Sequence, residues 1–233
     1  MQSVKHIKEQ LNHIRQEVEI SAKNASRDPK DITLVAVSKT FPNEYIEIAY
    51  NDNQRVFGEN KTQELSIKVP NLPNDIEWHM IGHLQSNKVK QAVELASYIH
   101  SVDSLKLLRR IDRIAGELNK KPKIFIEVNI SGETSKFGTT KDEVTEMVKE
   151  AIHCENLELI GYMTMAPFGV DEEELRFVFS SLRKLRDEIN NQLSIELKEL
   201  SMGMSNDFKI AIEEGATFVR VGSSIFGKRS YQV

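Results

Sequence analysis

Lys39 lies just past a short apolar run of this 233-residue sequence, where its amine could do covalent chemistry. The run 32–37 reads as a strand, and alternation along it places Lys39 on the same face as Val35 and Val37. Burial favours the neutral amine, which is the form that attacks an aldehyde to make a Schiff base. Taken alone, however, Lys39 is better explained as an exposed lysine at a strand end.

Arg220 stands between Val219 and Val221 in a second apolar run. An arginine keeps its charge, so a buried Arg220 needs a partner. That partner is either a carboxylate inside the protein, such as Glu127, or an atom of a ligand.

Two glycine- and serine-containing loops carry groups that could bind a phosphate. One is the segment 201–205, which includes Ser205, and the other is 222–227, which begins with Gly222 and Ser223. Glycine allows close approach of the backbone, and free amides at the start of a helical turn bind anions. A tight turn with a helix cap explains either loop by itself, but the pair together favours phosphate.

The elements that must position these groups alternate regularly between strand and helix. A first helix carries Val4, Ile7, Leu11, Ile14 and Val18 on one face. Helices are expected between the strands, which suits parallel pairing through crossover connections. The expected strands cover 32–37, 55–58, 77–81, 98–101, 123–130, 157–162, 199–201 and 217–221.

Eight such units in one chain of this length predict a single α/β (β/α)8 TIM-type barrel with an extra N-terminal helix. An open, doubly wound sheet is the alternative. The strand 123–130 favours the barrel, because Phe125, Glu127 and Asn129 share one face and the other face is wholly apolar. In a closed barrel the first and last strands are neighbours, so Lys39 and Arg220 would face one lumen.

Composition and motifs exclude several classes of function. The net charge of −4 gives no support to nucleic-acid binding, and no run approaches the ~18 apolar residues of a membrane span. Cys154 is the single cysteine, which suits a reducing, cytoplasmic location. His79 and His83 are four apart, but no third metal ligand is apparent. No P-loop, dinucleotide-binding or Ser-His-Asp pattern is present.

Six segments together resemble the pyridoxal phosphate homeostasis protein family, also called the proline synthetase co-transcribed protein family. Ser223 is a mild departure, since a threonine is expected at this position in many relatives. The segments are LVAVSKT at 34–40, FGEN at 57–60, WHMIGHLQSNK at 78–88, GYMTM at 161–165, LSMGMSND at 200–207 and RVGSSIFG at 220–227.

The resemblance implies a barrel like the N-terminal domain of alanine racemase, with pyridoxal 5′-phosphate (PLP) bound as a Schiff base on Lys39. It implies that Arg220 faces the pyridine nitrogen and that the phosphate lies on Ser205, Gly222 and Ser223. It also implies that Asn60, His83 and Met165 are neighbours of the cofactor.

These implications favour a carrier or buffer of PLP in vitamin B6 homeostasis over an enzyme. Arg220 would disfavour protonation of the pyridine nitrogen, which makes the ring a poor electron sink. Racemases add a second domain to the barrel, and with the chain ending at Val233 we expect one domain, 1–233, that is a monomer. Apo forms of PLP-dependent enzymes are the expected partners.

Two alternatives stay open at this point. The first is a PLP-dependent amino-acid racemase, in which Tyr162 or a loop histidine supplies the second base. The second is another phosphate-binding barrel, in which Lys39 forms a Schiff base with a sugar phosphate.

Overall fold

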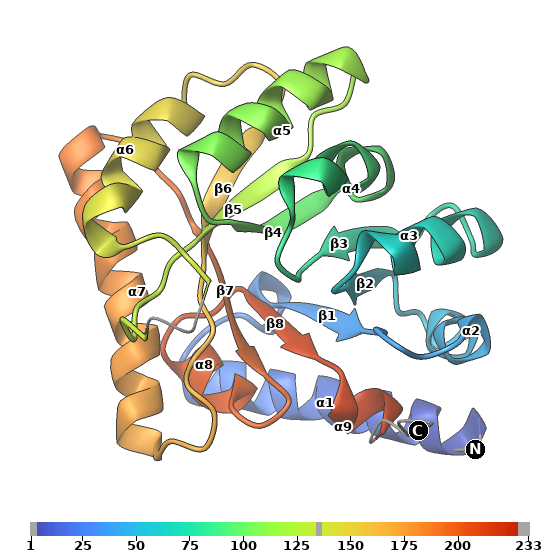
Figure 1. The fold of residues 1–233 in the computed structure, drawn as a ribbon. Coiled ribbons are helices and arrows are strands. Elements are labelled where there is room, and N and C mark those ends of the chain that lie inside the picture. Colours follow the sequence, from blue (N-terminus) through green and yellow to red (C-terminus); the bar gives the residue numbers. More distant parts are fainter. Residues whose placement is uncertain (1–3, 134–136, 228–233) are drawn as a thin grey trace.

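Eight parallel strands close into a barrel in the computed structural model, which describes residues 4–133 and 137–227 (Figure 1). Each strand pairs with the next along the chain, and β8 pairs with β1. The barrel and its N-terminal helix match the predicted fold class. The strands are β1 (Thr33–Val37), β2 (Val56–Glu59), β3 (Glu77–Met80), β4 (Tyr98–Val102), β5 (Lys123–Glu127), β6 (Glu158–Met163), β7 (Glu199–Met204) and β8 (Phe218–Val221).

Helices surround the barrel and connect successive strands (Figure 1). They are α1 (Val4–Asn24), α2 (Asn43–Asn51), α3 (Thr62–Lys68), α4 (Val89–Leu95), α5 (Leu105–Glu117), α6 (Lys141–Ala151), α7 (Glu172–Leu193), α8 (Phe208–Glu213) and α9 (Ser223–Phe226). Short 3₁₀ turns occur at Pro29–Asp31, Val69–Asn71 and Ser86–Lys88. No helix within the described ranges is both long and apolar enough to cross a membrane.

The two faces of the strands pack into separate apolar clusters. Outward-facing side chains join the helices in one large core. A small second cluster fills the lumen and consists of Val35, Tyr98, Phe125, Met163 and Phe218. The lumen is therefore a packed interior toward its amino-terminal end, and space for a ligand remains at the other end.

Helix starts are fixed by polar caps that the sequence supplies. Ser104 Oγ accepts a bond from Leu107 N–H at the start of α5, and Asp171 Oδ1 accepts one from Glu174 N–H at the start of α7. Thr140 forms a capping box with α6. Such caps satisfy amides that a helix leaves unpaired, and each contributes about 1 kcal/mol.

Helix α1 lies outside β1 and β8 and packs against α2, α8 and α9 (Figure 1). Of the residues predicted to face the protein, Ile7, Leu11, Ile14 and Val18 are buried, and the side chain of Val4 lies outside the part of the chain that the structure describes. This helix therefore supports the elements that follow β7 and β8.

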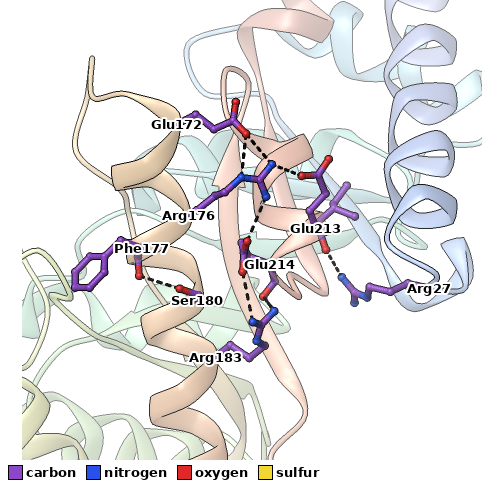
Figure 2. Close-up of polar contacts among 9 residues, drawn as sticks. Arg27, Glu172, Arg176, Phe177, Ser180, Arg183, Glu213 and Glu214 are labelled. Atoms are coloured by element: carbon purple, nitrogen blue, oxygen red, sulfur yellow. Dashed lines mark hydrogen bonds and ion pairs between the residues drawn. The ribbon is translucent and has the colours of Figure 1, made fainter.

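Charged side chains tie α7 to α8 on the outside of the barrel (Figure 2). Arg176 pairs with Glu172 on its own helix and with Glu213 and Glu214 at the end of α8. Arg27, just past α1, donates to backbone carbonyls at the end of α8 and beyond it. These contacts hold α8 in place, and with it the loop that follows β7.

Candidate functional site

A cavity of about 740 Å³ opens at the carboxyl ends of the strands. Its volume falls within the range of about 300–1,000 Å³ that is typical of small-molecule sites. The structure brings all of the predicted site residues to this cavity: Lys39, Asn60, His83, Met165, Ser205, Arg220, Gly222 and Ser223. Closure of the barrel brings these residues together, because each lies near or just past the carboxyl end of its strand. The strands are β1, β2, β3, β6, β7 and β8.

A buried polar network holds the segment that carries Lys39. Ser38 Oγ donates to Glu59 Oε1 at 2.6 Å, and the ammonium of Lys68 donates to the Ser38 carbonyl at 2.9 Å. On the other side of Lys39, the amide of Thr40 donates to Glu64 Oε2 at 2.7 Å. The backbone is thus fixed on both sides of Lys39.

Lys68 is the cation of this network. It is 5% exposed and bonds Glu59 Oε1 at 2.8 Å and Glu64 Oε2 at 2.9 Å. Burial raises the pKa of Glu59 to about 7, opposed by the Lys68 charge and by hydrogen bonds from Lys68 and Ser38. Glu59 Oε2 is buried and, among the described residues, lacks a hydrogen-bond partner, which is consistent with a carboxyl group that binds a proton readily.

Arg220 lies inside the barrel, opposite Val35 of β1, and is 5% exposed. Its Nη1 donates to Ser201 Oγ at 2.5 Å, and its Nη2 donates to the Thr164 carbonyl at 3.1 Å. Burial lowers the pKa of Arg220 to about 10 while the charge of Glu127 acts in the opposite direction. The guanidinium therefore remains charged at neutral pH.

Hydrogen bonds join the two predicted phosphate loops. The amide of Gly222 donates to Ser205 Oγ at 3.1 Å, and Ser224 Oγ donates to the Ser205 carbonyl at 3.5 Å. A Cβ at Gly222 would lie 3.1 Å from the carbonyl oxygen of Val37, so this residue permits close packing of the loop on β1. Ser223 begins α9, where the first amides are free of helical bonds.

The opposite wall of the cavity carries a histidine with two fixed partners. His83 Nδ1 lies 3.2 Å from Asp103 Oδ2, and the ring stacks on Phe137 with centroids 3.8 Å apart. Gly82 is required before it, because a Cβ there would lie 2.4 Å from the Asn60 carbonyl oxygen. This close contact places the loops after β2 and β3 side by side.

Sequence reasoning missed the importance of Glu127 at this site. Its carboxyl lines the cavity, is 2% exposed, and has its pKa raised to about 7 by burial, with the charge of Asp103 adding to the rise and that of Arg220 opposing it. Strand alternation predicts that the Glu127 side chain points inward. It does not predict that this carboxyl lines the cavity with a raised pKa. Phe168, which is 94% exposed at the cavity, follows no periodic pattern and was also missed.

Tyr162 is not at the cavity, so the suggestion that it supplies a second base is wrong. Its ring packs in the outer core, and its hydroxyl has no partner in the part of the chain that the structure describes. Burial raises the pKa of this phenol further above its ordinary value. Successive side chains of a strand point to opposite faces, and Met163 faces the lumen, so Tyr162 faces outward.

The expected strand 123–130 is also too long. The structure ends β5 at Glu127, and beyond it Asn129 turns into a loop, where Nδ2 donates to the Glu133 carbonyl at 2.8 Å. Asn129 therefore does not extend the polar face of the lumen. Among the described residues, no group of three or more histidine, cysteine or acidic side chains is placed to bind a metal ion.

Comparisons with known proteins agree with this geometry. A family model described as alanine racemase, N-terminal domain, matches residues 10–230. The pyridoxal phosphate homeostasis protein of Aquifex aeolicus is 39% identical over 224 residues, covering 96% of this chain and 98% of that protein.

Solved structures also include proteins that are similar to this chain. PipY of Synechococcus elongatus, in a structure with PLP bound, is 38% identical with a TM-score of 0.84, covering 95% of this chain and 100% of that one. An alanine racemase from Clostridium difficile is 17% identical with a TM-score of 0.72, covering 94% of this chain and 60% of that one. This last likeness concerns the fold alone.

Proposed function

This chain belongs to the pyridoxal phosphate homeostasis protein family, and from that premise we propose that it binds PLP reversibly as a Schiff base on Lys39. The observation that carries the proposal is the meeting of Lys39, Arg220 and the two bonded phosphate loops at one cavity. PLP supplies an aldehyde, a pyridine nitrogen and a phosphate, and the cavity offers a group of suitable chemistry for each.

Each residue has a distinct part in this proposal. The Lys39 amine condenses with the aldehyde of PLP, with release of water, and Arg220 donates a hydrogen bond to the pyridine nitrogen. Ser205 and Ser223 bind the phosphate through hydroxyl groups and the first amides of α9, and Gly222 lets the backbone approach it. Asn60, His83 and Met165 line the remaining wall and limit the movement of the ring.

We propose that the protein carries or buffers PLP rather than turning over amino acids rapidly. A charged Arg220 disfavours protonation of the pyridine nitrogen, whereas enzymes that use the ring as an electron sink place a carboxylate there. The charges of Glu127 and Asp207 raise the pKa of Arg220 and so favour its charged form. Apo forms of PLP-dependent enzymes are the proposed recipients, and we propose a cytoplasmic, monomeric protein of one domain.

An absorbance titration tests the binding step. Purified protein is mixed with PLP at neutral pH, and the band of the Schiff base is followed against that of the free aldehyde. We expect saturable formation of the new band, its loss in Lys39→Ala, and its retention in Lys106→Ala, where an exposed lysine on α5 is removed. A wild-type protein that takes up no PLP, or a Lys39→Ala variant that keeps the band, contradicts the proposal.

Amino-acid racemisation is the second candidate function, and it is favoured by the position of the Glu127 carboxyl at the cavity. A buried carboxyl with a pKa of about 7 at the cavity could exchange a proton with a bound amino acid. Incubation of PLP-loaded protein with amino acids in deuterated water distinguishes the two functions. Slow or absent exchange of the α-hydrogen supports a carrier, and exchange at enzyme-like rates that disappears in Glu127→Gln supports a racemase.

A further inference from the structure

An unbroken chain of hydrogen-bond contacts crosses the inside of the barrel and ends at Arg220. Glu77 Oε1 lies 3.1 Å from His79 Nε2, and His79 Nδ1 lies 2.9 Å from His100 Nε2. His100 Nδ1 lies 2.8 Å from Ser201 Oγ, which accepts a bond of 2.5 Å from Arg220 Nη1. These side chains come from β3, β4, β7 and β8, so the chain joins opposite walls of the barrel.

The inner members of this chain are sealed from water. His79, His100 and Ser201 are each 0% exposed, whereas the Glu77 side chain is 40% exposed at the amino-terminal end of β3. The His79 ring also stacks on Tyr98 with centroids 4.1 Å apart and planes 13° apart. Packing thus fixes the rings, and the chain reaches solvent at Glu77 and the cavity at Arg220.

Arg220 at one end of the chain can only donate hydrogen bonds, and the Glu77 carboxylate at the other end can only accept them. These two ends fix which partner donates in every hydrogen bond between them. Arg220 can only donate, so Ser201 Oγ accepts from it and its own proton is free to go to His100 Nδ1. His100 then carries its proton on Nε2 and donates to His79 Nδ1. His79 in turn carries its proton on Nε2 and donates to the carboxylate of Glu77, which can only accept.

The opposite direction needs one extra proton in the interior. His79 would then be an imidazolium that donates to both Glu77 and His100. Burial lowers the pKa of His79, and the Glu77 hydrogen bond and charge oppose that change while the Lys123 charge adds to it. Burial lowers the pKa of His100 well below its ordinary value, with the His79 and Arg220 charges acting in the same direction. Both rings are therefore neutral near pH 7.

We propose that Glu77, His79, His100 and Ser201 are positioning residues that hold the Arg220 guanidinium in one orientation and as a fixed donor toward the cavity. The group that faces Arg220 must be a hydrogen-bond acceptor, because a guanidinium can only donate, and the chain holds that donor in place. Only the identity of that acceptor, the pyridine nitrogen of PLP, rests on the proposed function.

Histidine NMR on the PLP-free protein tests the direction of the chain. Protein labelled with ¹⁵N in histidine shows which ring nitrogen carries the proton, and His79→Gln and His100→Gln assign the two signals. We expect both rings to be neutral near pH 7, with the proton on Nε2 and Nδ1 unprotonated. A charged ring, or a proton on Nδ1 of either residue, overturns the proposal.

Single substitutions test the coupling to Arg220. Ser201→Ala removes the link, so we expect the Nδ1 signal of His100 to shift and PLP affinity to fall about tenfold, the effect of one hydrogen bond to a charged donor. Lys39 should still form the Schiff base, with its absorption band at a changed position. Glu77→Gln should shift the same histidine signals and lower affinity less. Unchanged signals and affinity in Ser201→Ala contradict the proposal.

A matched control separates this coupling from a general change of charge. Glu158 is an exposed carboxylate at the start of β6, at the same end of the barrel as Glu77 but outside the chain. Glu158→Gln should leave both the histidine signals and the PLP affinity unchanged, and an effect equal to that of Glu77→Gln refutes the assignment. If the wild-type protein binds no PLP, the proposed function fails, but the NMR experiment still decides the direction of the chain.

Discussion

Replacing Lys68 with methionine should destabilise the protein far more than replacing a lysine of a surface ion pair. The ammonium of Lys68 makes three bonds of 2.8–2.9 Å, to Glu59, Glu64 and the Ser38 carbonyl. Methionine keeps the volume of the stem but leaves Glu59, which is 0% exposed, without its cation. Breaking a buried ion pair in this way costs about 3–5 kcal/mol, a large part of the typical total stability of about 5–15 kcal/mol.

The loss should also depend on pH. Without Lys68 the pKa of Glu59, already about 7, rises further, so the carboxyl is neutral at pH 5.5 and costs little there. At pH 8 the wild-type carboxylate is paired, while the variant must bury an unpaired charge or bind a proton from dilute solution. We therefore expect the destabilisation by Lys68→Met to be larger at pH 8 than at pH 5.5.

Urea unfolding followed by circular dichroism at the two pH values measures both effects. The matched control is Lys149→Met, because Lys149 pairs with Glu146 on the surface at 2.6 Å with about half of its side chain exposed. That variant should lose about 0–1 kcal/mol at either pH. Equal losses in the two variants, or a loss in Lys68→Met that does not change with pH, refute the reasoning. Adding Glu59→Gln to Lys68→Met should recover part of the stability, since the fully buried side chain is then uncharged and only the partly exposed Glu64 is left without its cation.

Three further predictions follow from the described contacts. Arg176→Ala removes the exposed ion pairs between α7 and α8 (Figure 2), and its free energy of unfolding in urea should fall by about 1 kcal/mol or less, so a loss above 3 kcal/mol contradicts the account. Burial raises the pKa of Glu127 to about 7 in the folded state, above its unfolded value, so this carboxyl should lower the free energy of unfolding by about 3 kcal/mol as pH rises from about 4.5 to 7. Because the pKa of Glu59 is raised in the same way, Glu127→Gln should remove only the Glu127 share, and its stability should fall by about 3 kcal/mol less than that of the wild type over this range. Gly82→Ala places a methyl group 2.4 Å from the Asn60 carbonyl oxygen. Urea unfolding should show a loss of about 1–3 kcal/mol in the free energy of unfolding, and PLP binding should weaken. Unchanged stability and binding contradict the prediction and show that the loop moves freely.

Most of the fold could be predicted because strands and helices each leave a local pattern. The strand 32–37 and the helix face of Ile7, Leu11 and Ile14 are visible in a few residues, and closure of the barrel follows from eight such units. Strand ends were less predictable. β7 continues to Met204, although a strand was expected only at 199–201 and a loop at 201–205, and β5 stops before Asn129. Backbone pairing with a neighbouring segment decides where a strand ends.

The cavity residues could be predicted from topology, since a barrel brings the carboxyl ends of its strands together. Alternation along a strand also indicated that Glu127 and Arg220 face the lumen. What alternation cannot show is which inward side chains meet across the lumen. Contact between His100 and Ser201 depends on the relative heights of β4 and β7, 101 residues apart in sequence, so the chain of histidines could not be found without the structure.

Covalent trapping tests the central claim most directly. The protein is incubated with PLP at neutral pH, reduced with borohydride, digested, and analysed by mass spectrometry. Our account predicts one stoichiometric pyridoxyl-phosphate adduct on the peptide that contains Lys39, and no such adduct in Lys39→Ala. An adduct distributed over many surface lysines, or one located on a lysine outside the cavity, contradicts it.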